Sequence, residues 1–324
     1  MQAQTKLALM GVARRLSDRL PDTLARGARG VGHLVVDGQG ERKSALRQLQ
    51  YAVLHRTSPV LAAPFGAGEL LVDSRDREIG RTVFVTGGYE RWHMRAAVEH
   101  LCSMGRDPAG RLFVDVGANI GTSTVDALVH FGFGRAVCFE PAVRNARLLR
   151  ANLAWNGLDE RAVVHQIALS DIEGTGVLLH SPTNSGDHRF STGRTSAPAP
   201  AGGGLEEPAA CRRLDAFVEE GVIDPSDVGL VWIDAQGHEP NILHGARRLL
   251  DAKVPVVLEY CPWMLGPSIV DLDAEIARFF SIVVPLNPAA GGGQKDEVLR
   301  TPRDLPDLAR RFAQRGYADL LLLP

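Results

Sequence analysis

The sequence contains few cysteines, and they lie far apart. Only four of the 324 residues are cysteine, namely Cys102, Cys138, Cys211 and Cys261, so no C-x-x-C pair is present. Zinc knuckles and thiol redox motifs need closely spaced pairs, and disulfide scaffolds need a denser set. The spacing argues against all three classes and favours a reducing, cytoplasmic location.

The sequence also lacks an excess of basic residues and any long apolar run. The chain has 36 basic and 38 acidic residues, for a formal net charge of -2 at pH 7. Without a broad basic field it has little attraction for a polyanion, so we expect no nucleic-acid partner. No apolar run approaches the roughly 20 residues that a membrane helix needs, so we expect no membrane partner either.

The composition is otherwise that of a globular protein, with 45% hydrophobic and 23% charged residues. From residue 111 onward, short β-rich runs alternate with helical patterns, and this alternation predicts an α/β fold with a doubly wound, mostly parallel sheet. The predicted strands are 112–116, 136–140, 163–169, 229–234 and 255–259.

Three parts are expected along the chain. Residues 1–60 read as an N-terminal helical extension through which copies of the chain could form a homo-oligomer. Residues 61–110 read as a hairpin, formed by 69–72 and 82–85, followed by a helix. Residues 111–324 form the main domain, in which a Pro/Gly/Ala-rich insertion at about 191–210 is either a flexible lid or a passive solvated loop.

The segment Phe113-Val-Asp-Val-Gly-Ala-Asn-Ile-Gly121 lies where a predicted strand turns into a helix. Glycine at such a turn lets the backbone approach a ligand, and the first helical turn offers free N–H groups. Asp115 is placed to meet a cationic amino group. A tight turn without any ligand would use the same glycines, so the turn alone is a weak signal.

Glu140 strengthens the interpretation of a nucleotide site. It ends the second strand 19 residues after Gly121, where a carboxylate can accept hydrogen bonds from both ribose hydroxyls. NAD sites need a glycine at the position of Asn119 so that the pyrophosphate can approach, and a cofactor without a diphosphate therefore fits better. The alternative is that Glu140 only caps the following helix.

These residues resemble the FkbM family of S-adenosylmethionine-dependent methyltransferases. The resemblance covers about residue 65 to the end. It is carried by Val114-Asp-Val-Gly-Ala-Asn-Ile-Gly121, Cys138-Phe-Glu-Pro141, Asn152, Ala168-Leu-Ser-Asp171, Leu214-Asp215, Trp232-Ile-Asp-Ala-Gln-Gly-His-Glu239 and Gly245-Ala246. The family commonly has a lysine where Trp232 stands and an acidic residue where Gln236 stands.

The resemblance implies a class I (Rossmann-like) methyltransferase that binds S-adenosylmethionine. It implies O-methylation of a hydroxyl on a small-molecule acceptor, either a sugar or a polyketide-like secondary metabolite. Transfer to nitrogen or carbon, and a non-catalytic domain that binds a partner, remain as alternatives. The expected cofactor-binding residues are Asp115, Gly117, Ala118, Asn119, Gly121, Glu140, Pro141, Ser170 and Asp234.

The catalytic residues are expected after the fourth strand. Ligands of open α/β sheets lie beyond the carboxyl ends of the strands, which places Asp234 and His238 at the site, with Glu239 beside them. A histidine base predicts activity that rises through a pKa of roughly 6.5. If Mg²⁺ polarises the hydroxyl instead, Asp234 would be a ligand. No set of metal-binding residues is assigned, and Glu239 could equally only satisfy the first turn of its helix.

Overall fold

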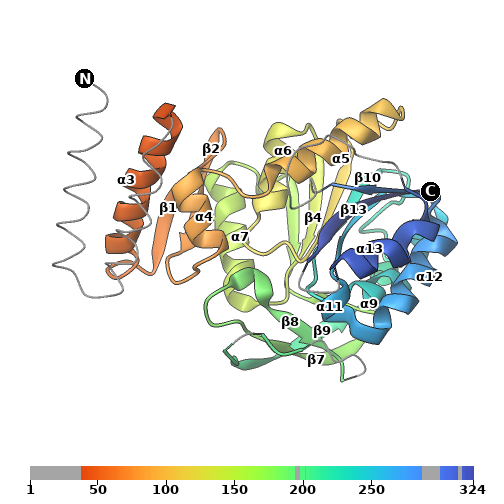
Figure 1. Ribbon diagram of the computed structural model, residues 1–324. Helices are drawn as coiled ribbons and strands as arrows, with labels where there is room; N and C mark the ends of the chain where they lie inside the picture. Colours follow the sequence, from red (N-terminus) through yellow and green to blue (C-terminus); the bar gives the residue numbers. More distant parts are fainter. Residues whose placement is uncertain (1–37, 194–197, 201, 287–299, 313–315) are drawn as a thin grey trace. The chain divides into compact units, whose positions relative to one another are not determined.

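The structure is a computed structural model of the chain and describes residues 38–193, 198–200, 202–286, 300–312 and 316–324. The chain divides into two compact units, Met1–Tyr89 and Glu90–Pro324 (Figure 1). The helices expected before residue 38 lie outside the described residues. No helix in the described ranges is both long and apolar enough to span a membrane.

In the first unit, helix α3 (Gly38–Leu54) precedes the antiparallel strands β1 (Val60–Phe65) and β2 (Gly68–Asp73), and helix α4 (Ile79–Thr86) follows them. The predicted pairing of 69–72 with 82–85 is therefore wrong, because 82–85 is helical. Ile79 and Val83 are four residues apart and both buried, so helical spacing places them on one apolar face. Burial of that face outweighs the strand preference of a β-branched run.

The second unit contains a seven-stranded sheet in the order β12-β13-β11-β10-β3-β4-β5. All neighbouring pairs from β5 to β11 are parallel, whereas β13 runs antiparallel to both of its neighbours. The strands are β3 (Leu112–Val116), β4 (Arg135–Phe139), β5 (Ala162–His165), β10 (Val228–Ile233), β11 (Val256–Tyr260), β12 (Ile282–Pro285) and β13 (Ala318–Leu323). The predicted doubly wound, mostly parallel sheet is thus confirmed.

Helices pack in groups around this sheet. α5 contacts α6, and α12 contacts both α9 and α13, as Figure 1 also shows. The helices of this unit are α5 (Arg91–Ser103), α6 (Thr122–His130), α7 (Val143–Trp155), α8 (Leu214–Glu219), α9 (Glu239–His244), α10 (Arg247–Asp251), α11 (Pro262–Leu265), α12 (Ile269–Phe279) and α13 (Leu305–Phe312). Three short 3-10 helices are η1 (Ser185–Asp187), η2 (Gly266–Ser268) and η3 (Pro302–Asp304).

A separate four-stranded sheet has the order β6-β9-β7-β8, with β6 (Ala168–Leu169), β7 (Gly174–Leu179), β8 (Arg189–Ser191) and β9 (Glu206–Arg212). Two expectations change here. The single strand expected at 163–169 is two strands in different sheets, and both ends of the tract at 191–210 belong to strands. The end at 206–210 is ordered because β9 pairs with β7 along six residues, from Gly174↔Cys211 to Leu179↔Glu206.

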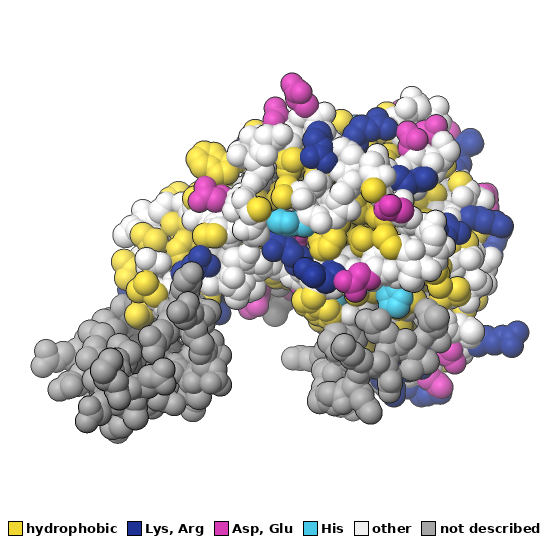
Figure 2. Space-filling model, turned by 90° about the horizontal axis from the view of Figure 1, so that it is seen from above, with side chains coloured by type: hydrophobic (Ala, Val, Ile, Leu, Met, Phe, Trp, Pro, Cys, Tyr) yellow, Lys and Arg dark blue, Asp and Glu magenta, His cyan; other side chains and the backbone are white. Residues whose placement is uncertain are grey.

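Both signs of charge are spread over the surface seen in Figure 2. The main apolar core forms where buried side chains of the central strands meet those of α9, α10, α12 and α13. This core holds the carboxyl ends of the parallel strands, which carry the polar residues described next.

Candidate active site

The turn after β3 brings two strand ends together. Gly117 has a φ of 82°, and a Cβ placed on it would lie 1.8 Å from the carbonyl oxygen of Asp234. Gly121 also has a positive φ, of 94°, and its missing Cβ leaves room for Leu149. The close approach that requires glycine at position 117 is thus between β3 and the end of β10.

Glu140 is joined to the same turn. Its Oε2 accepts a hydrogen bond from the backbone N–H of Asn119 at 2.9 Å, and its Oε1 accepts one from that of Ala142 at 2.8 Å. Burial raises the pKa of Glu140 to about 7. Ala118 is buried against β4, since its N–H donates to the carbonyl of Phe139, and Pro141 links Glu140 to the residue that precedes α7.

Asp115 is buried in β3 with one oxygen satisfied and one not. Its Oδ2 accepts hydrogen bonds from the hydroxyls of Ser123 and Thr124, whereas Oδ1 is buried and has no hydrogen-bond partner. Burial raises the pKa of Asp115 to about 6. An unsatisfied buried carboxylate oxygen is costly, so Oδ1 is suited to a donor supplied by a ligand.

Asp234 follows β10 and is linked to the next strand through Gln236. The Nε2 of Gln236 donates to Asp234 Oδ1 at 2.7 Å and to Glu259 Oε2 at 3.0 Å. Burial raises the pKa of Asp234. It raises that of Glu259 well above its usual range, and the acidic neighbours act in the same direction. The side-chain amide of Gln236 therefore bridges two carboxyl groups. An acidic residue at position 236 would instead place a third carboxyl group beside them.

Glu239 is fully buried and faces its own loop. Its carboxylate accepts hydrogen bonds from the N–H groups of Ala235 and Gly237. Burial raises the pKa of Glu239 to about 7. These contacts show that Glu239 holds the turn after β10. Its expected catalytic role stays a prediction.

His238 lies beside Ser170 rather than beside Asp234. Its Nε2 lies 3.0 Å from Ser170 Oγ, while its Nδ1 is buried and has no hydrogen-bond partner. Ser170 Oγ also donates to Asp171 Oδ1 at 3.0 Å. Burial lowers the pKa of His238 to about 4. The four-residue spacing of Asp234 and His238 thus does not join the two side chains directly.

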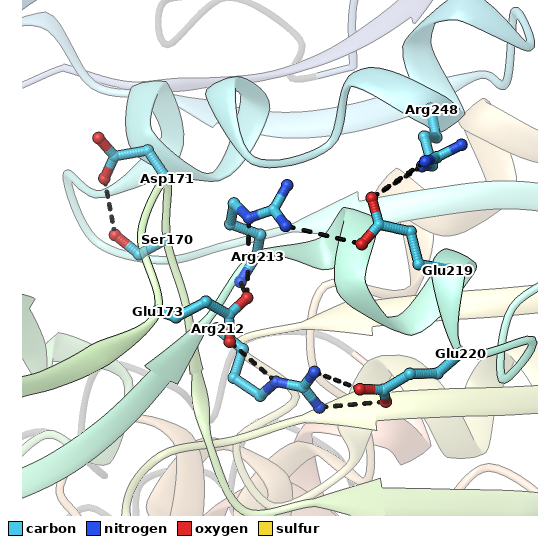
Figure 3. Close-up of polar contacts among 8 residues, drawn as sticks. All are labelled: Ser170, Asp171, Glu173, Arg212, Arg213, Glu219, Glu220 and Arg248. Atoms are coloured by element: carbon cyan, nitrogen blue, oxygen red, sulfur yellow. Dashed lines mark hydrogen bonds and ion pairs between the residues drawn. The ribbon is translucent and has the colours of Figure 1, made fainter.

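An ion-pair network holds the chain near Ser170 (Figure 3). Arg212 in β9 pairs with Glu173 and with Glu220, and the backbone N–H of Arg213 donates to Glu173 at 3.1 Å. Ser170 itself donates its N–H to the carbonyl of Arg212. Arg213 also lies 3.7 Å from Glu219 at the end of α8, so the small sheet and α8 are joined next to Ser170.

A polar segment at 185–190, after β7, reaches the turn after β3. The carbonyl of Ser185 accepts hydrogen bonds from the side-chain amides of Asn119, at 2.9 Å, and Asn145, at 3.3 Å. Of the remaining members, His188 accepts a bond from Ser181 N–H and Arg189 pairs with Asp187. This segment therefore borders the expected cofactor site.

Sequence reasoning missed three acidic residues at this edge of the sheet. Glu259 ends β11, Asp319 pairs with it from β13, and Glu90 precedes α5. Glu259 could have been found, because it ends a predicted strand as Glu140 does. Asp319 could not have been found in this way, because β13 is antiparallel to its neighbours. The start of β13, and not its end, therefore lies at the carboxyl edge of the parallel strands.

The chain matches the Methyltransferase FkbM domain over residues 115–281, which is more than half of its length. It therefore belongs to the FkbM methyltransferase family. When the seven strands of its main sheet are numbered along the chain from β3 to β13, their order across the sheet is 3-2-1-4-5-7-6. Strand 7, which is β13, runs antiparallel to its neighbours. The family and this sheet together define a class I methyltransferase fold. Comparison with curated proteins gave no match.

Several solved structures show limited similarity. TYW2 from M. jannaschii in complex with AdoMet is 9% identical, with 82% of this chain and 85% of that chain covered and a TM-score of 0.41. A precorrin-6y C5,15-methyltransferase from Geobacter metallireducens is 12% identical, with 69% and 87% covered and a TM-score of 0.35. An RNA methyltransferase from Salinibacter ruber in complex with S-adenosyl-L-homocysteine is 13% identical, with 50% and 73% covered and a TM-score of 0.27.

Proposed function

We propose that the chain is an O-methyltransferase that uses S-adenosylmethionine to methylate a hydroxyl of a small-molecule natural product or sugar. The observation that carries this proposal is the carboxylate of Asp234 at the carboxyl edge of the sheet. Gln236 binds its Oδ1, and among the described residues no hydrogen bond reaches Oδ2. Oδ2 is thus available to accept the proton of a hydroxyl.

The residues around the turn fit the cofactor. Asp115 Oδ1, buried without a partner, would accept a hydrogen bond from the ammonium group. Each oxygen of Glu140 already accepts one backbone hydrogen bond and can accept another from a ribose hydroxyl, because a carboxylate has about four acceptor positions. When bound, S-adenosylmethionine supplies a methyl group that its sulfonium leaving group has already activated.

The work left to the protein is alignment and removal of a proton. An aliphatic hydroxyl is about as weak an acid as water, with a pKa of roughly 16, so a positioned base assists the transfer. Asp234 is the base that the contacts favour.

The test uses S-adenosylmethionine labelled with ¹³C in its methyl group and a panel of sugars, polyketide alcohols, amines and carbon nucleophiles. We expect the label to appear as a methoxy group in two-dimensional NMR spectra of the product, and Asp234→Asn to slow its appearance by about 100- to 10,000-fold. Label found on nitrogen or carbon would overturn the hydroxyl assignment. Absence of S-adenosylmethionine binding in calorimetry would overturn the cofactor assignment.

A further inference from the structure

A histidine and two carboxylates meet where α5 begins and β13 begins. Glu90 precedes α5, His93 lies in its first turn and Asp319 lies in β13. One ligand atom from each lies within 4.8 Å of the other two. The Tyr317 hydroxyl lies 3.4 Å from Glu90 Oε1 and borders the group. None of these four residues belongs to the methyl-transfer machinery described above.

His93 is the independent evidence for a ligand. Its side chain is only 1% exposed, and neither Nδ1 nor Nε2 has a hydrogen-bond partner. Buried imidazoles are normally hydrogen-bonded, because an unpaired buried polar group costs about 1–3 kcal/mol. Nδ1 nevertheless lies 3.1 Å from Asp319 Oδ2, outside hydrogen-bond geometry.

That separation matches two ligands of one ion. Ligands at about 2.1 Å from a metal, with a right angle between them, lie about 3.0 Å apart. His93 Nδ1 and Asp319 Oδ2 are 3.1 Å apart. The two atoms therefore need little movement to share a cation, and Glu90 lies close enough to complete a third position.

The charges around the group also call for a cation. Asp319 is directly opposite Glu259 in the antiparallel pair of β13 and β11, so two buried acidic side chains are cross-strand neighbours. Like charges in directly opposite positions destabilise a sheet. Glu90 and Asp234 add further negative charge near Asp319.

We propose that Glu90, His93 and Asp319 bind one divalent transition-metal cation of the manganese or zinc type. Two carboxylates balance the charge of a divalent ion. One imidazole nitrogen with two carboxylate oxygens suits manganese or zinc better than calcium or magnesium, which take oxygen ligands. The site is distinct from Asp234 and Gln236, and its existence does not depend on methyl transfer.

The experiment measures Mn²⁺ binding to chelator-treated full-length protein, without cofactor or acceptor. Electron paramagnetic resonance should show about one bound Mn²⁺ per chain with a ¹⁴N coupling from the His93 imidazole, and Zn²⁺ should displace it. Glu90→Gln, His93→Gln and Asp319→Asn should each weaken binding at least about tenfold. His93→Gln should also abolish the nitrogen coupling.

The matched control is His244→Gln. His244 also lies near a carboxylate, at 3.4 Å from Glu275, but it belongs to α9 and should leave Mn²⁺ binding unchanged. Glu90 is only partly buried, so Glu90→Gln keeps the test decisive if the buried variants fail to fold. The proposal is overturned if wild type binds no stoichiometric Mn²⁺, or if binding survives Glu90→Gln but is lost in Asp234→Asn. S-adenosylmethionine affinity, measured separately, reports on the proposed function instead.

Discussion

At the residue scale, Asp234 and His238 differ in environment although both follow β10. His238 is 2% exposed, and burial lowers its pKa to about 4, because the imidazolium form loses its hydration. A base with so low a pKa is weak at neutral pH. Burial acts in the opposite direction on Asp234 and raises its pKa, which makes that carboxylate more basic than an exposed one.

We therefore expect Asp234→Asn to lower kcat by about 100- to 10,000-fold and His238→Ala to lower it by much less. With Asp234 as base, activity falls as pH decreases and the carboxylate becomes protonated, with a midpoint above its usual 3.8. Turnover measured with the true acceptor over a range of pH checks both statements. A larger loss in His238→Ala, with cofactor affinity intact, would restore the histidine as the base.

At the scale of elements, one glycine determines how closely β3 and β10 approach. Gly117 follows β3, and the carbonyl of Asp234, just past β10, occupies the space that a Cβ would need. The two strands are parallel neighbours with Ile233 opposite Val116. A side chain at position 117 would separate Asp115 from Asp234, and with them the two halves of the site.

Gly117→Ala should destabilise the protein more than Gly157→Ala. Both positions have positive φ, at 82° and 66°, but a Cβ at Gly157 would meet nothing within 4 Å. The left-handed backbone alone costs roughly 1–2 kcal/mol, and overlap at position 117 should add roughly 1–3 kcal/mol. Urea denaturation measures both free energies of unfolding. Equal losses of stability in the two variants would show that the ends of β3 and β10 move apart without a cost in free energy.

At the scale of the whole molecule, buried carboxyl groups make stability depend on pH. Burial raises the pKa of Glu140 and of Glu239 to about 7, compared with 4.5 in an exposed glutamate. Between these values the folded chain keeps protons that the unfolded chain has lost, so the free energy of unfolding falls as pH rises. His188 and His238, whose pKa values are lowered to about 4, act in the opposite direction up to about 6.5.

Comparison with Glu140→Gln isolates one of these groups. Relative to this variant, wild type should lose roughly 2–3 kcal/mol of stability as pH rises from about 4.5 to about 7, because a shift of one pKa unit is about 1.4 kcal/mol. Urea denaturation across that pH range gives the difference. Glu160→Gln, which changes an exposed carboxylate, should show no such trend. Parallel pH curves for wild type and Glu140→Gln would contradict the buried-carboxyl account.

The parallel strands and the glycine turn after β3 could be predicted from sequence, because their signals are local. A buried strand reads as a short apolar run, and Gly117, Gly121 and Glu140 lie at fixed distances along the chain. Helix α4 was missed, because its β-branched residues favour a strand until packing buries one helical face. The prediction of strand 163–169 failed for a related reason, since its second half pairs with β9 rather than with β4.

Only the tertiary structure decided which charged groups meet. Glu90, Glu259 and Asp319 are separated by many residues along the chain. Antiparallel pairing places Asp319, near the start of β13, opposite Glu259 at the carboxyl end of β11. The start of α5 brings Glu90 close to Asp319. Burial likewise decided the basicity of His238 and Asp234, because a pKa depends on desolvation that no local spacing encodes. The sequence by itself thus determined the fold class and the glycine turn after β3, while the folded chain determined the electrostatics of the candidate site.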